Sequence, residues 1–295
     1  MADFVIFTDS TSDLGKDMRD KYNIEYVYMN VNVNEKEYIA DLDWKEFSPK
    51  EFYDWMRKGA KVYTTQVSIS EFINKFSSAL EQGKDVLYLS VSSKLSGSIN
   101  TALNVKNELL EKYPDRKIIC IDTLRATLGE GLIAIKAAQL RALGKTIEEV
   151  AEYIENNKLC FHEAATVESL SYLKNAGRVK ATSAFFGNLI GVKPMIIADA
   201  LGNNYAIKKV KGRRTSLLEI MNMVRERIVD PQNQIICVEH ADCEVDNEFV
   251  RQHIIDEFNP KEVYVNYIGP IIGATVGPGS IIVAYFGIKE TVCGE

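Results

Sequence analysis

The sequence predicts an α/β fold, with an N-terminal Rossmann-like domain on a parallel sheet and a C-terminal α+β domain. In the first half, short apolar runs alternate with longer amphipathic segments, which is the pattern of successive βαβ units. In the second half, strands pair as hairpins or lie between helices in a mixed order. The length of 295 residues favours two domains, and we expect them at 1–158 and 159–295.

Strand–helix units organise the first half. A hairpin and a helix read as insertions between the first two units, and a last helix leads out of this half. We expect strands at 4–7, 86–89 and 117–121, the hairpin at 31–40, and helices at 14–22, 49–58, 71–80, 98–113, 126–143 and 146–157.

The second half mixes hairpins with helices. The stretch 263–288 has no charged residue and is long enough to span a bilayer, but glycines and prolines divide it. We therefore read it as two buried strands around a glycine-rich loop at 273–279, and expect no membrane span. The expected strands are 159–166, 192–198, 204–210, 234–239, 261–267 and 281–286, and the helices are 168–178, 216–228 and 244–257.

Composition excludes several classes of protein. A net charge of −6 argues against a nucleic-acid binder, because neutralising phosphates dominates such binding. The hydrophobic share of 46% argues against a disordered chain. The five cysteines include no CxxC pair and the three histidines no ligand spacing, so we expect reduced thiols, a cytoplasmic location and no metal site. The first nine residues show no signal peptide.

Hydroxyl side chains gather where the predicted strands end. TDSTS at 8–12, which includes Ser10, follows the first strand, SVSSKLSGS at 90–98 the second, and Asp122-Thr123 the third. Carboxyl ends of parallel strands meet at one edge of a sheet, where ligands bind. Helix capping explains any single residue of these clusters, but not five serines in one loop. The surplus indicates a site for a small anion such as a carboxylate or phosphate, to which TTQVS at 64–68 and the 273–279 loop could add.

Other motifs support rival functions. GEGLIA, from Gly129 to Ala134, fits GxGxxA and would serve an NAD(P)-dependent oxidoreductase, although a packed helix explains its small residues better. A serine hydrolase would need His162 or His240 to activate a serine. The basic run at 208–214 is either a solvated hairpin face or a docking point for an acidic or phosphate-bearing partner. A binding module for some other ligand also stays open.

Several motifs together resemble the DegV family of bacterial fatty-acid-binding proteins. The likeness runs from end to end of the chain. The motifs are TDSTSDL at 8–14, TTQVS at 64–68, SSKLSGSINTA at 92–102, Asp122-Thr123, YLKNAGRV at 172–179, LIGVKPMI at 189–196 and IGPIIGATVGPG at 268–279.

The resemblance implies a carrier rather than an enzyme, with no catalytic residues and no cofactor. A long-chain fatty acid would lie between the two domains, its carboxylate bound by Thr64 and Ser96. Ser10, Gly97 and Thr275 are further candidate ligand contacts, and Thr275 stands where the family commonly has a histidine.

The resemblance also implies a partner. In the best-understood members, an acyl kinase related to dihydroxyacetone kinases phosphorylates the bound carboxylate. By position in the basic run, Arg213 is the residue implied in contact with such a kinase.

Overall fold

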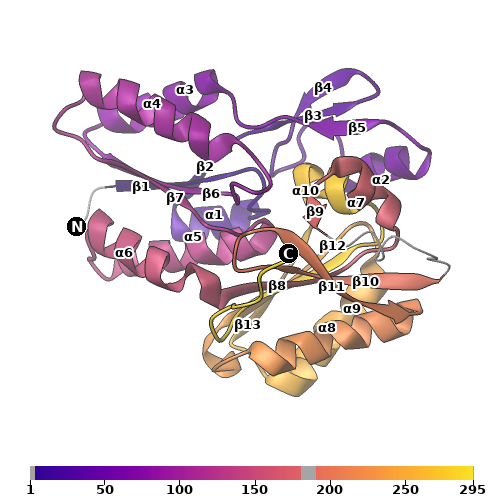
Figure 1. The fold of residues 1–295 in the computed structure, drawn as a ribbon. Coiled ribbons are helices and arrows are strands. Elements are labelled where there is room, and N and C mark those ends of the chain that lie inside the picture. The colour runs from indigo at the N-terminus through magenta and orange to yellow at the C-terminus, as the bar shows by residue number, and fades with distance from the viewer. Residues whose placement is uncertain (1–3, 181–190, 295) are drawn as a thin grey trace.

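Three sheets organise the computed structural model, which describes residues 4–180 and 191–294 (Figure 1). The first sheet has four parallel strands in the order β2-β1-β6-β7, which confirms the predicted parallel sheet. Strand β2 is missing from the predicted elements, because this edge strand buries only its two end residues and shows no alternation. The strands are β1 (Phe4–Asp9), β2 (Ile24–Val27), β6 (Asp85–Ser90) and β7 (Ile118–Asp122).

Helices cover both faces of this sheet. Helices α3 and α4 lie on one face, and α1, α5 and α6 lie on the other (Figure 1). The predicted helices are confirmed to within a few residues at each end. Their bounds are α1 (Lys16–Tyr22), α3 (Ile69–Glu81), α4 (Ser98–Lys112), α5 (Thr127–Ala142) and α6 (Ile147–Asn157).

Helix α5 lies between the parallel sheet and the sheet of the second half (Figure 1). It packs closely on both sides because two of its residues lack a Cβ. A Cβ on Gly129 would lie 2.2 Å from Oε1 of Glu163, and one on Gly131 would lie 2.9 Å from the carbonyl oxygen of Ser12. The GEGLIA motif is therefore the interior of a packed helix rather than a phosphate-binding turn.

The insertion forms a small antiparallel sheet with the order β4-β3-β5. The predicted hairpin is confirmed as β3 (Asn30–Val33) and β4 (Lys36–Ile39), and α2 (Pro49–Arg57) follows a capping box of Ser48 and Glu51. The third strand, β5 (Val62–Thr64), is missing from the predicted elements; it pairs with β3.

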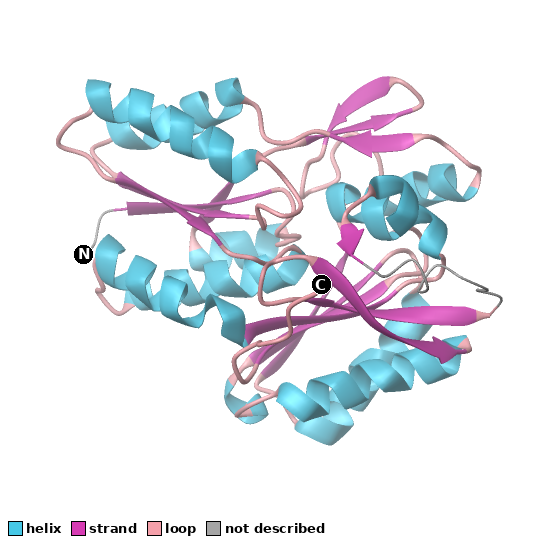
Figure 2. Cartoon of the chain, in the orientation of Figure 1, coloured by secondary structure: helices cyan, strands magenta, loops and turns pink. Residues whose placement is uncertain are grey.

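The second half forms a mixed seven-stranded sheet with the order β13-β12-β14-β8-β10-β11-β9. Helices α8 and α9 cover one face, along the bottom of Figure 2, and α5 packs on the other. The first two residues of the 189–196 motif lie outside the described residues. The elements are η1 (Lys158–Cys160), β8 (Phe161–Thr166), α7 (Leu170–Ala176), β9 (Val179–Lys180), β10 (Val192–Ala198), β11 (Asn204–Lys211), α8 (Arg213–Arg227), η3 (Pro231–Asn233), β12 (Ile235–His240), α9 (Glu244–Phe258), β13 (Glu262–Tyr267), α10 (Pro270–Val276) and β14 (Ile281–Phe286).

Helix α10 corrects the prediction of a glycine-rich loop at 273–279. Pro270 occupies the first turn, where its missing N–H is not needed, and Gly277 ends the helix at φ +78°. The glycines and prolines therefore mark the ends of a short helix, and only 277–280 remain a turn.

Residue 158 separates the strands of the parallel sheet from those of the seven-stranded sheet, and we propose it as the domain boundary. Among the described residues, no helix combines the length and apolar character needed to cross a membrane.

Candidate functional site

A cavity of about 150 Å³ lies between the two halves of the molecule. Its walls are largely apolar and come from both halves: from the first, Met29 and Val91, and from the second, Ile196, Ile271 and Ile282. An apolar cavity of roughly 150 Å³ holds a ligand about the size of benzene. A longer apolar ligand therefore fits only if lining side chains move.

Four polar residues surround the outer part of this cavity, and we call them the mouth: Thr64, Ser96, Arg178 and Thr275. Thr64, Arg178 and Thr275 also line a second hollow of about 490 Å³, so the two spaces meet there. The hydroxyls of Thr64 and Thr275 make no hydrogen bond with any described residue. The structure thus brings the predicted Thr64, Ser96 and Thr275 together, with Gly97 beside them.

Ser96 and Gly97 stand at the N-terminus of α4. The Ser96 hydroxyl lies 2.9 Å from that of Ser98 and accepts a hydrogen bond from the Ser98 N–H at 3.3 Å. Gly97 leaves room for Gln66, whose Nε2 donates to Thr101 Oγ1 at 2.7 Å; a Cβ at Gly97 would meet Gln66 Oε1 at 2.2 Å. The mouth therefore lies beside the partial positive charge of a 15-residue helix, which favours an anion.

Arg178 is a mouth residue that the sequence analysis leaves unassigned. Its side chain is exposed, and its Nη1 donates to the carbonyl oxygen of Ala176 at 2.7 Å. Among the described residues that line the cavity, it carries the one positive charge. The glycine in YLKNAGRV was a sequence signal for this position. Gly177 ends α7 in the left-handed region at φ +64°, and the next residue, Arg178, reaches the Leu95 carbonyl oxygen of the first half.

Ser10 does not line the cavity. It is fully buried, and its hydroxyl accepts a hydrogen bond from the Met29 N–H at 2.9 Å. The nearby hydroxyls of Thr8 and Ser12 lie 3.0 Å apart and pair with each other. The first hydroxyl cluster therefore holds loops together, and of its residues Thr11 alone reaches the cavity wall within the described part of the chain.

Thr11 bridges two buried carboxyl groups. Its hydroxyl contacts Asp9 Oδ1 and lies 2.7 Å from Glu130 Oε2, yet it has only one proton to donate. Asp9 also accepts from the N–H of Thr11 and from Tyr88 and Val91, each at 3.0 Å, so Asp9 is the acceptor. Glu130 in its neutral form can donate to Thr11 in turn. Burial independently raises the pKa of Glu130 well above its usual value.

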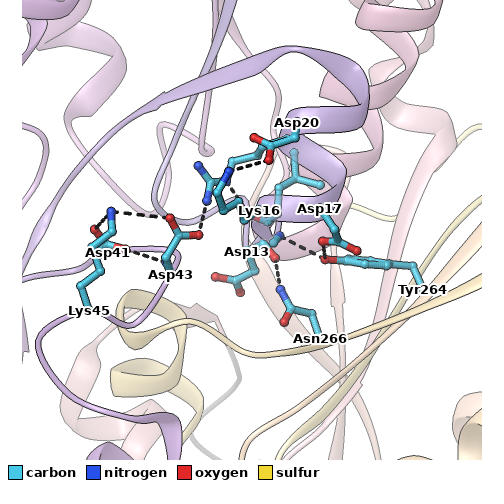
Figure 3. Close-up of polar contacts among 12 residues, drawn as sticks. Asp13, Lys16, Asp17, Asp20, Asp41, Asp43, Lys45, Tyr264 and Asn266 are labelled. Atoms are coloured by element: carbon cyan, nitrogen blue, oxygen red, sulfur yellow. Dashed lines mark hydrogen bonds and ion pairs between the residues drawn. The ribbon is translucent and has the colours of Figure 1, made fainter.

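Asp13 and Glu239 face each other across the two halves. The Asp13 carbonyl oxygen accepts from Asn266 Nδ2 at 2.7 Å, whereas its carboxylate carries no hydrogen bond in Figure 3 and lies against Gly269. Burial, and then the neighbouring carboxyl group, raise the pKa of Glu239; burial likewise raises that of Asp13. Both shifts favour the neutral, protonated form of these carboxyl groups.

A third buried carboxyl group, Glu163 on β8, lines the cavity itself. Its Oε1 accepts from the Ala126 N–H at 2.7 Å, and burial raises its pKa to about 7 even though Arg125 favours the charged form. With Thr11 and Thr127 it forms the buried wall of the cavity. The sequence offered one signal for it, a single charged residue inside the predicted buried strand at 159–166.

The two histidines that a serine hydrolase would need make other contacts. His162 Nε2 lies 2.6 Å from the Ile288 carbonyl oxygen, and burial lowers its pKa to about 4. His240 Nδ1 accepts from the Cys243 N–H at 3.4 Å. Within the described chain, neither histidine hydrogen-bonds a serine hydroxyl. No group of His, Cys, Asp or Glu among the described residues is arranged to hold a metal ion.

Arg213 lies apart from the mouth, at the start of α8. Its Nε pairs with Asp246 Oδ2 at 2.7 Å, and its Nη2 donates to the Gly279 carbonyl oxygen at 2.7 Å. The next residue, Arg214, stacks over the Phe249 ring at 3.5 Å from its centroid. Both arginines are thus held in place by α9 and by the turn after α10.

Comparison with known proteins gives a consistent result. A family model described as "Uncharacterised protein, DegV family" matches residues 3–287. The DegV domain-containing protein CPE0026 of Clostridium perfringens is 39% identical over 287 residues, 97% of this chain and 98% of that protein. A DegV domain-containing protein of Streptococcus pyogenes serotype M1 is 30% identical over 96% of this chain and 98% of its own length.

Solved structures are similar over nearly the whole chain. The DegV family protein of Thermus thermophilus, described by its fatty-acid binding, superimposes with a TM-score of 0.87 at 29% identity, covering 96% of this chain and 99% of its own. A stearic acid-binding protein of Eubacterium ventriosum gives 0.84 at 25% identity, covering 96% and 98%. Because the family model matches residues 3–287 and a relative is 39% identical over 97% of the chain, this chain belongs to the DegV family.

Proposed function

We propose that this protein binds a long-chain fatty acid, with the carboxylate at the mouth and the hydrocarbon tail in the cavity. One observation carries the proposal: the apolar cavity meets the outer hollow at free hydroxyls and a cation. Thr64 and Ser96 would hydrogen-bond the carboxylate, with Gly97 and Thr275 beside them. Ser10 would act indirectly, by fixing the loop that carries Met29.

Relatives support this ligand class. The similar proteins of Thermus thermophilus and Eubacterium ventriosum bind a fatty acid and stearic acid, respectively. Thr275 replaces the histidine common in the family, so this contact would be a neutral hydroxyl here. The mouth then relies on Arg178 and the α4 N-terminus for positive potential.

Hydrocarbon burial would supply most of the affinity. Each buried CH₂ contributes about 0.8 kcal/mol, so a tail of about fifteen would contribute roughly 12 kcal/mol. Ordering the ligand costs several kcal/mol, and moving the side chains that close the cavity costs more. The remainder, together with the hydrogen bonds to the carboxylate, corresponds to a dissociation constant of roughly micromolar order.

We further propose that the protein is a carrier and that an acyl kinase related to dihydroxyacetone kinases is its partner. A carboxylate at the mouth would be reachable from the outer hollow while the tail stays buried. The kinase would dock on the basic run that contains Arg213. A cytoplasmic location is part of this proposal, since the kinase would draw on ATP.

Ligand binding tests the first part. Organic extraction and mass spectrometry of the native protein should yield a long-chain fatty acid. After removal of bound lipid, the double variant Thr64→Ala/Ser96→Ala should bind oleate about 100-fold more weakly, because each hydrogen bond to a charged group contributes roughly 1.5–3 kcal/mol. Ser93→Ala is the matched control, since Ser93 is exposed in the same loop and does not line the cavity. Equal oleate affinity in all three proteins would sink the site assignment.

Acyl phosphate formation tests the second part. With the kinase and ATP, wild-type protein loaded with oleate should support formation of oleoyl phosphate, and Ser96→Ala should slow it. Arg213→Ala should slow the same reaction without changing oleate affinity, because Arg213 lies away from the mouth. Unchanged rates in the Arg213 variant would refute docking at that residue.

A further inference from the structure

The buried wall of the cavity holds a carboxyl oxygen that a plain hydrocarbon cannot satisfy. Glu163 is 7% exposed and lines the cavity from β8. Its Oε1 accepts from the Ala126 N–H, and its Oε2 makes no hydrogen bond or ion pair with any described residue. A hydrocarbon chain that fills this part of the cavity would displace water from Oε2 and offer no hydrogen bond in return.

Among the described residues, no side chain around Glu163 makes a hydrogen bond with Oε2. Arg125 is the neighbouring cation. Its Nε and Nη1 donate to the carbonyl oxygens of Phe161, Leu124 and Asp199, and its Nη2 has no partner in the described part of the chain but forms no ion pair with Glu163. The Thr11 hydroxyl is shared between Asp9 and Glu130, and the Thr127 hydroxyl lies beside Glu239.

The packing of α5 against β8 also fixes the position of this carboxyl group. Gly129 leaves only the space that Glu163 occupies, since a Cβ there would meet the Glu163 carboxyl oxygen at 2.2 Å. The Ala126 N–H at the start of α5 binds this same oxygen, Oε1, so Oε2 is the oxygen left without a partner among the described residues. Glu163 is therefore a positioned hydrogen-bonding group inside the ligand cavity.

We infer that the cavity favours an acyl ligand that carries a hydroxyl group on its chain, and that this hydroxyl hydrogen-bonds Glu163. The inference rests on the proposed function, because it assumes that the ligand's carboxylate lies at the mouth. A hydroxyl suits Glu163 in either protonation state: it donates to a carboxylate and accepts from a carboxylic acid. An unsubstituted chain covers Oε2 and leaves it unpaired.

Other polar substituents fit less well. A second carboxylate on the ligand would meet Glu163 and the neighbouring Asp9, Asp13 and Glu239, which already lack cations. An ammonium group would have to lose its hydration in an otherwise apolar cavity next to the buried Arg125. A neutral hydroxyl avoids both costs.

The test compares matched ligands on the full chain after removal of bound lipid. Stearic acid is titrated beside stearic acids that carry one hydroxyl near the head, the middle or the tail of the chain. At least one hydroxylated acid should bind about 10-fold more tightly than stearic acid, because a site built for a hydroxyl discriminates against the analogue that lacks it. In Glu163→Leu the preference should vanish, whereas Glu163→Gln, whose amide still hydrogen-bonds, should keep it within a few-fold.

Each outcome decides the inference. If stearic acid binds and no hydroxylated acid binds more tightly, the inference is overturned while the proposed function stands. If no acid binds at all, both fall. A preference that persists in folded Glu163→Leu also overturns the assignment to Glu163. Should Glu163→Leu fail to fold, because the Ala126 N–H loses its acceptor, the wild-type series and Glu163→Gln still decide the matter. Glu155→Leu, an exposed carboxylate on α6, is the matched control and should leave all affinities unchanged.

Discussion

The mouth and the buried wall of the cavity treat negative charge in opposite ways. The mouth offers half-buried hydroxyls, an exposed arginine and a helix N-terminus to an anion that the ligand would bring. The buried wall borders the protein's own carboxyl groups, and burial raises their pKa values. The comparison teaches that polarity alone does not identify a binding site: a ligand-binding group has to be both polar and left without an internal partner.

The largest expected effect is a pH dependence of folding stability that comes from the buried wall and not from the mouth. Burial raises the pKa of Glu163 from 4.5 to about 7, so the folded protein holds a proton that the unfolded chain releases between these values. Stability therefore falls as pH rises through this window, by about 3 kcal/mol in all. Glu163→Gln should flatten that part of the curve and be more stable than wild type above pH 7. Urea unfolding across the window measures this, and Ser96→Ala at the mouth should keep the wild-type slope. If the unfolding free energies of Glu163→Gln and wild type change with pH in parallel, Glu163 is not the source of this pH dependence.

Removal of the hydroxyl between Asp9 and Glu130 should have the next largest effect. Thr11→Val leaves two buried carboxyl groups facing each other without their shared partner, which should cost about 2 kcal/mol of unfolding free energy. Urea unfolding near neutral pH measures the loss. The exposed Thr291 gives the control, because Thr291→Val should change stability by less than about 0.5 kcal/mol. A Thr11 variant as stable as its control would show that the bridge contributes nothing.

A smaller change tests how the mouth is held. Gly97→Ala places a Cβ where Gln66 Oε1 now lies, so Gln66 must move and lose its hydrogen bond to Thr101. We expect oleate affinity to fall roughly fivefold, corresponding to about 1 kcal/mol. The double variant Gly97→Ala/Gln66→Ala removes the clash and should recover part of the affinity. Additive effects in that cycle would argue against the contact as the cause.

The smallest expected effect concerns the exposed cation of the mouth. Arg178→Gln should weaken oleate binding two- to threefold at low ionic strength, and the difference should disappear near 1 M salt because exposed charges are screened. Lys174→Gln on α7 is the matched control, since Lys174 is exposed and lines neither hollow. A salt-independent loss would mean that Arg178 acts through packing instead of charge.

Much of the fold could be predicted because its signals are local. The strands β1, β6 and β7 each precede a helix, and that alternation alone indicates a parallel sheet. Elements whose patterns are set by distant neighbours were harder to identify. Strand β5 exists because it pairs with β3, and the glycines of α10 look like loop residues until their place at its ends is known.

The mouth likewise has a local sequence signal, whereas the buried wall depends on distant neighbours. The serine surplus at 90–98 pointed to the mouth because it exceeded what helix capping requires. Asp9 and Ser10 gave the same kind of signal, yet their partners lie inside the protein, at Val91 and Met29. Glu163 could not be placed beforehand, because its environment depends on how α5 packs against β8 across the two halves.

The packing of helix α5 bears on whether the first half can be produced without the second. Because both of its faces are buried, a recombinant fragment that ends at residue 158 would expose the side that now packs on β8 and β14, including Leu128 and Leu132. A contiguous apolar surface of this kind promotes aggregation. The first half thus has a sheet of its own, but we expect it to need the second half to cover the apolar side of α5.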